Sequence, residues 1–174
     1  MITSVSFNPV SIKLFDYRTL VFSLCFIAGN ILLPQLCHFV PDGGKIFLPI
    51  YFFTLIASYK FGIRIGLLTA ILSPLLNHVL FGMPPMHILP ILLIKSSLLA
   101  VIGALVATGT QKISLVYVAL VVVCYQLLGG VAEFFITGSL AKAVQDFTLG
   151  YPGMLIQVVV GWWILRKLAK VRFQ

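Results

Sequence analysis

Residues 48–104 read LPIYFFTLIASYKFGIRIGLLTAILSPLLNHVLFGMPPMHILPILLIKSSLLAVIGA, and this stretch decides the fold of the chain. Its three apolar runs are separated by a short basic turn at residues 60–64 and by a charge-free, proline-rich turn at residues 82–85. Each run approaches the roughly 20 residues that a helix needs to cross the core of a bilayer, although the first is short. We therefore predict successive membrane-spanning helices.

A stripe of small and polar residues runs along the middle helix of this stretch. Successive members lie three or four residues apart, which places them on one helical face: Gly62, Gly66, Thr69, Ser73 and Asn77. Within lipid, such a face lets a second helix approach closely. We expect this helix to be central to the packing of the molecule.

The composition of the whole chain indicates the same class. Of its 174 residues, 60% are hydrophobic and only 9% are charged, whereas a soluble domain carries about 25% charged residues. We predict an all-α integral membrane protein that forms one domain over residues 1–174, with no room for a soluble catalytic module. The three cysteines are widely spaced and form no CxxC pattern, so we expect no disulfide framework.

Six apolar segments are predicted to cross the membrane, at residues 20–40, 46–59, 63–81, 88–108, 113–137 and 151–168. The first is longer than the apolar core of a signal peptide and no small-residue cleavage site follows it, so we expect it to be retained. Residues 139–150, SLAKAVQDFTLG, are typical of a short amphipathic segment along the membrane surface.

The basic residues predict how these segments are oriented. With the N-terminus in the cytoplasm, nine of them fall inside: Lys13, Arg18, Lys60, Arg64, Lys112, Arg166, Lys167, Lys170 and Arg172. Only Lys45 and Lys142 fall outside, a bias that favours cytoplasmic N- and C-termini. The net charge of +8 is therefore explained by membrane topology, and we expect no nucleic-acid partner.

Polar side chains gather toward the outer face in this topology. At 1.5 Å per residue, Lys95 lies about 10 Å and Glu133 about 6 Å from the outer ends of their helices, so their depths are compatible. Charges inside a membrane usually face a cavity or a partner. We predict an outward-facing pocket whose candidate substrate-binding residues are His38, Asp42, Asn77, His78, His87, Lys95, Gln126, Glu133 and Gln157.

Simpler interpretations of these residues stay open. Lys95 could extend to the membrane surface, or only hold two helices together through Glu133. Each histidine taken singly is typical of an interfacial residue. Together, His38, His78 and His87 are an alternative metal site, in which Cys37, Met83 or Met86 would suit a transition metal or the metal of a corrinoid or haem.

Enzymatic activity is not expected, and no cofactor is predicted. The chain has no HExxH, GxSxG or Walker motif, and it has only four acidic residues. ATP-driven work would need partner subunits. An intramembrane enzyme that uses His78, His87 and Glu133, or an accessory membrane protein, remain as alternatives.

Several of these motifs resemble the S component, the substrate-binding membrane subunit, of energy-coupling factor (ECF) vitamin transporters. The matching pieces are LPI at residues 48–50, KFGIRIGLLTAILSPLL at 60–76, GMPP at 82–85 and the glycine-containing apolar run at 98–105. They lie within residues 48–105, a stretch of about a third of the chain, and the length of the chain and its six predicted segments agree with the family.

The resemblance implies an S-component-like bundle of six helices in a prokaryotic plasma membrane. It implies a vitamin or related micronutrient bound near the outer face, and a membrane T subunit with two ATPases as partners. Small residues on the first helix dock the T subunit in this family, and Cys25 and Gly29 are the nearest equivalent here. Lys95 stands where relatives carry an acidic residue, which suggests an anionic substrate.

Overall fold

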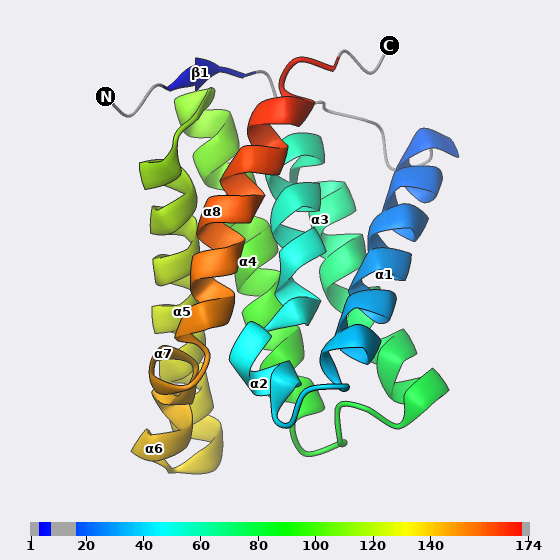
Figure 1. Ribbon diagram of the computed structural model, residues 1–174, viewed down its shortest axis with the longest axis vertical. Coiled ribbons are helices and arrows are strands. Elements are labelled where there is room, and N and C mark those ends of the chain that lie inside the picture. The colour runs from blue at the N-terminus through cyan, green and yellow to red at the C-terminus, as the bar shows by residue number, and fades with distance from the viewer. Residues whose placement is uncertain (1–3, 8–16, 172–174) are drawn as a thin grey trace.

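The computed structural model describes residues 4–7 and 17–171, and these fold into a bundle of helices (Figure 1). The long helices are α1 (Tyr17–Cys37), α3 (Phe52–Phe81), α4 (Leu89–Thr110), α5 (Leu115–Thr137) and α8 (Tyr151–Leu168). The short elements are β1 (Val5–Ser6), α2 (Gly43–Phe47), the 3₁₀ helix η1 (Pro49–Tyr51), β2 (Lys112–Ile113), α6 (Leu140–Ala143) and α7 (Gln145–Thr148).

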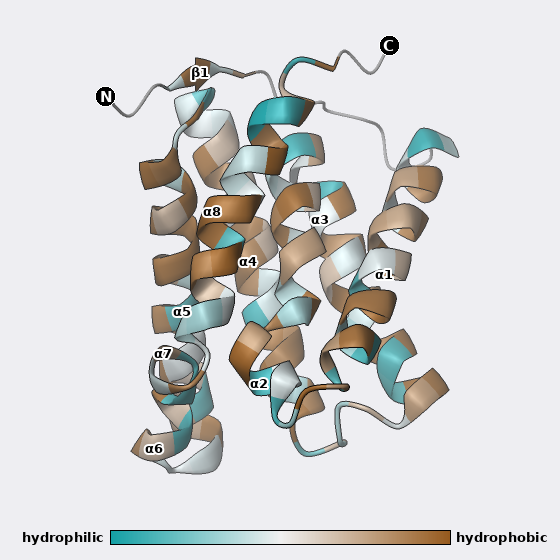
Figure 2. Cartoon of the chain, in the orientation of Figure 1, coloured by the Kyte–Doolittle hydropathy of each residue, from teal (hydrophilic) through white to brown (hydrophobic). Residues whose placement is uncertain are grey.

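Four helical segments in the described residues are long and apolar enough to cross a membrane: Tyr17–Cys37, Pro49–Phe81, Leu89–Thr110 and Leu115–Thr137. Hydrophobic residues cover much of their length (Figure 2). These segments indicate a multi-pass membrane protein. The predicted segment at 151–168 coincides with α8, but α8 is not among the four, and its last turn carries Arg166 and Lys167.

The predicted segments at 46–59 and 63–81 are joined in α3, which is broken at Gly62. Gly62 has φ 80° and ψ −175°, a conformation outside the helical region that glycine adopts without steric cost. A Cβ added at Gly66 would lie 2.6 Å from the Cβ of Ser58, although residues eight apart in a straight helix are separated by about 12 Å. The two halves of α3 therefore fold back on each other at Gly62.

A buried asparagine on α1 confirms this arrangement of α3. Asn30 Nδ2 donates to Thr54 Oγ1 at 2.9 Å and to Ser73 Oγ at 3.3 Å, and these hydroxyls lie on opposite sides of the break. The amide of Phe53 donates to Asn30 Oδ1 at 3.1 Å. The predicted stripe is confirmed as a packing face, because its last four members, from Gly66 to Asn77, are buried.

Several predicted boundaries shift in the structure. Helix α1 begins and ends three residues earlier than the predicted 20–40. The expected helix start at residue 46 is wrong, because Leu48 takes a left-handed conformation (φ 47°) between α2 and η1. Helix α5 begins at Leu115 rather than 113, since β2 pairs with β1 and Ser114 Oγ caps the helix by accepting from Val116 N at 3.4 Å.

The bundle has two distinct ends. Strand β1 and the C-terminal end of α8 lie at one end, whereas α2, α6 and α7 lie at the other (Figure 1). The predicted surface segment at 139–150 forms α6 and α7, two single-turn helices that pack against the end of α5. We call α6 and α7 together the cap, because they cover the site described next. Lys13 and Arg172, two of the nine basic residues predicted to lie inside, fall outside the described residues.

Candidate functional site

Three ionisable side chains meet beneath the cap. Lys95 Nζ on α4 lies 2.6 Å from Glu133 Oε2 on α5 and 2.8 Å from Asp146 Oδ2 on α7. The side chains of Lys95, Glu133 and Asp146 are only 4%, 14% and 16% exposed. We call these three residues the charge cluster. The predicted proximity of Lys95 and Glu133 is confirmed, whereas the contribution of Asp146 was not predicted.

A glycine pair on α5 makes room for this arrangement. A Cβ at Gly129 would lie 2.5 Å from Lys95 Cγ, so the bare backbone lets the lysine stem cross against α5. A Cβ at Gly130 would lie 2.8 Å from the carbonyl oxygen of Ala143 in the cap. Without these two close approaches, neither the ammonium nor the cap could reach its present position.

A chain of side-chain hydrogen bonds crosses the bundle from α8 to α5. Gln157 Nε2 donates to the carbonyl of Leu48 at 3.4 Å, and Tyr125 OH donates to Gln157 Oε1 at 2.9 Å. Gln126 Nε2 then donates to the Tyr125 hydroxyl oxygen at 3.0 Å. Gln126 is 1% exposed, and its Oε1 has no hydrogen-bond partner. We call Gln157, Tyr125 and Gln126 the amide chain.

Two tyrosines connect the amide chain to the charge cluster. The rings of Tyr51 on η1 and Tyr125 on α5 lie 5.4 Å apart and are tilted by 54°. Both side chains are almost fully buried, and Tyr125 lies about one turn of α5 from Gly129, against which the Lys95 stem packs. The charges, the aromatic rings and the amides therefore form one polar region, to which η1, α4, α5, α7 and α8 contribute.

The other predicted site residues take no part in the contacts described above. Asn77 Oδ1 accepts from Gln35 Nε2 at 3.2 Å, and Asp42 forms an exposed ion pair of 2.8 Å with Lys45. His78 Nδ1 lies 2.7 Å from the carbonyl oxygen of Pro84. His38 and His87 are exposed.

The alternative three-histidine metal site is not assembled. Within residues 4–7 and 17–171, no group of three or more His, Cys, Asp or Glu side chains is arranged to hold a metal ion. The three histidines lie in or beside three different helices. A shared predicted depth does not bring such side chains together around the bundle axis.

The predicted docking pair on α1 divides between two roles. Cys25 is exposed, as a docking surface requires. Gly29 instead lies against α3, where an added Cβ would meet the ring of Phe53 at 2.8 Å. The small size of Gly29 is therefore explained by packing within the chain, and its docking role stays a prediction.

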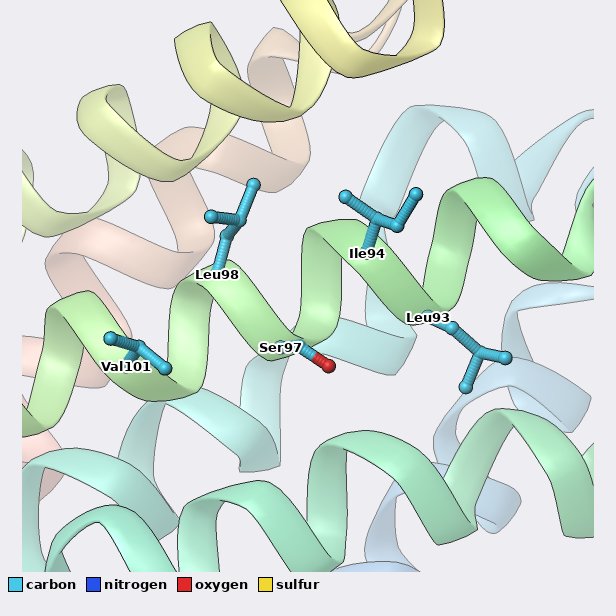
Figure 3. A pocket seen from close by; sticks show the side chains of 5 residues that line it. All are labelled: Leu93, Ile94, Ser97, Leu98 and Val101. Atoms are coloured by element: carbon cyan, nitrogen blue, oxygen red, sulfur yellow. The ribbon is translucent and has the colours of Figure 1, made fainter. Parts of the chain in front are cut away.

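A shallow hollow of about 380 Å³ lies on α4, lined by Leu93, Ile94, Ser97, Leu98 and Val101 (Figure 3). It is open, mostly apolar, and includes none of the predicted site residues. On a membrane helix, such a surface suits lipid tails or a neighbouring helix.

Sequence reasoning missed Asp146, Tyr51 and Tyr125. Asp146 had one usable signal, since it is one of only four acidic residues and lies in the short segment between two apolar helices. The tyrosines had none, because an aromatic residue in an apolar run is typical of ordinary packing. No family model, curated protein or solved structure matches this chain.

Proposed function

We propose that this chain is the substrate-binding membrane subunit for uptake of a vitamin or related micronutrient, acting with an ECF-type T subunit and two ATPases. The observation that carries the proposal is the polar region beneath the cap. Buried charges in a membrane protein are costly and mark ligand or ion sites by default. The motifs at residues 48–50, 60–76 and 82–85 support the assignment to this class.

The proposal includes six membrane crossings, with both chain ends in the cytoplasm of a prokaryote. The fold-back of α3 at Gly62 supports two crossings within that helix, and α8 supplies the sixth. In a variant without native cysteines, single cysteines at Lys45 and Lys142 should react with an impermeant maleimide from outside intact cells. A cysteine at Val171 should not react, and labelling of Val171 alone would reverse the orientation.

Partner subunits are part of the proposal because ATP-driven uptake needs a nucleotide-binding motif, and this sequence carries no Walker motif. The exposed face of α1 around Cys25 is the proposed contact with the T subunit. A lipid bilayer surrounds the remaining apolar surface.

Mass spectrometry of small molecules that co-purify with the chain tests the proposal. We expect a vitamin-sized molecule in stoichiometric amount. It should be lost when Glu133→Gln and Asp146→Asn are combined, and retained when the exposed Asp42 is changed to Asn. Wild-type protein that retains no molecule, in cells whose vitamin uptake is unchanged by deletion of the chain, contradicts the proposal.

A further inference from the structure

The charge cluster contains two carboxylates and one ammonium, so its formal charge is −1. In the described part of the chain, Lys95 is the only basic side chain paired with Glu133 or Asp146. Lys142 in the cap is exposed and forms no ion pair with either of them. The ammonium is already satisfied twice, which counts against the expectation that Lys95 binds an anionic substrate.

An excess negative charge at this position is unfavourable by itself. Desolvating an ion costs several kcal/mol unless opposite charge and hydrogen bonds compensate it. Each carboxylate side chain nevertheless remains about one-seventh exposed, at 14% and 16%. The carboxylates are therefore not sealed off, and a further positive charge can approach them.

The amide chain independently shows the same need for a donor group as the charge cluster shows for a positive charge. The Leu48 carbonyl only accepts, so Gln157 must present its NH₂ group there and its oxygen to Tyr125. The Tyr125 hydroxyl has one proton, which it gives to Gln157. Gln126 must therefore present its NH₂ group to Tyr125, and Gln126 Oε1 is left as a buried acceptor without a donor. Such groups are rare in native structures and require an explanation.

We infer that this region binds a small organic cation, a protonated amine or amidine that also carries a second N–H donor. Glu133 and Asp146 provide the compensating charge, and Gln126 Oε1 accepts the second donor. Gln126 and Glu133 lie two turns apart on one face of α5, a separation of about 10 Å, which is the length of a vitamin-sized molecule rather than of an inorganic ion.

This inference deepens the proposed function by naming the class of substrate. It rests on that function only in identifying the ligand as the transported molecule. Binding by the isolated chain is therefore tested separately from uptake. If the chain takes up an anion, the inference is wrong and the proposed function stands. If the chain binds the cation but supports no uptake, the inference stands and the proposed function is wrong.

The test uses three probes of matched shape: 4-aminobenzamidine as the cation, 4-aminobenzamide as the neutral isostere and 4-aminobenzoate as the anion. Each is added at equal millimolar concentrations to the purified full chain in nanodiscs, and the midpoint of thermal unfolding is recorded. We expect a concentration-dependent rise with 4-aminobenzamidine alone. The rise should be abolished in Asp146→Asn, reduced in Gln126→Leu, which leaves the cluster charges intact, and unchanged in Asp42→Asn.

Three outcomes overturn the inference. The first is stabilisation by 4-aminobenzoate, and the second is an equal response, or no response, to all three probes. The third is an infrared carbonyl band of a protonated carboxyl group that disappears in Asp146→Asn, because a shared proton would already neutralise the cluster.

Discussion

Two buried polar networks in this bundle differ in how completely they are satisfied. Around Asn30, both ends of one uncharged amide are bonded, to Thr54, Ser73 and the backbone of Phe53. Beneath the cap, the charge cluster has an excess carboxylate, and the amide chain ends in an unpartnered oxygen. The first network holds helices together, and the second retains capacity for a ligand.

The difference also lies in which elements build each network. Asn30 joins α1 to both halves of α3, so its partners belong to long helices that pack along their length. Asp146 belongs to a single-turn helix, and it reaches Lys95 only because Gly130 lets the cap approach α5. A network with one member on a short connecting element can open without separating the bundle.

The largest effect is expected for Lys95→Met, which leaves two carboxylates without their cation. Removing one partner of a buried ion pair costs about 3–5 kcal/mol. We expect a loss of that size in the free energy of unfolding, measured by titration with sodium dodecyl sulfate. Lys45→Met is the matched control, because the Lys45–Asp42 pair is 57% and 60% exposed, and exposed pairs contribute about 0–1 kcal/mol.

Neutral partners should reverse this loss. Combining Lys95→Met with Glu133→Gln and Asp146→Asn removes all three charges, so most of the stability should return. If Lys95→Met unfolds no sooner than Lys45→Met, then the cluster is not buried as described.

A smaller effect is expected at the satisfied network. Asn30→Leu leaves the Phe53 amide and the Thr54 hydroxyl without this partner, whereas Ser73 Oγ still donates to the Thr69 carbonyl oxygen. An unsatisfied buried group costs about 1–3 kcal/mol. We expect a loss in this range by the same titration, with no change in the response to 4-aminobenzamidine. Cys25→Leu, on the exposed face of the same helix, should be close to neutral. If the response to 4-aminobenzamidine changes in Asn30→Leu, then the two networks are energetically coupled, contrary to this expectation.

The smallest effect on stability is expected for Gln126→Leu. It removes an acceptor that is already unpartnered, together with one hydrogen bond to Tyr125, and a single bond contributes about 0.5–1.5 kcal/mol. The cost should lie at the low end of that range, while the probe response falls. A loss as large as that of Asn30→Leu would show that Gln126 is a structural residue and that its oxygen needs no ligand.

Periodicity and depth were enough to predict part of this molecule. The apolar runs placed the long helices to within a few residues, and the small stripe correctly indicated the face on which Gly66 and Ser73 are buried. Depth along two adjacent helices correctly predicted that Lys95 and Glu133 lie close together, because a fixed rise per residue converts sequence position into height along the helix.

The same reasoning could not predict the rest, because height does not specify position around the bundle. His38, His78 and His87 share a predicted depth, yet they are not assembled into one site. Asp146 lies in a segment whose hydropathy suits the membrane surface, and only the close approach at Gly130 turns it inward. Contacts of this kind depend on how short connecting elements pack against the long helices. The periodicity of a helical sequence does not predict that packing.

The order of the three charges along the chain has a consequence for biogenesis. Lys95 and Glu133 lie on consecutive helices, so the α4–α5 hairpin can partition from the translocon into the bilayer with its two charges already paired. Asp146 is synthesised later and joins the pair as part of the cap. Insertion of the hairpin thus precedes completion of the site, and a chain truncated after α5 should insert normally while lacking the carboxylate that makes the cluster negative.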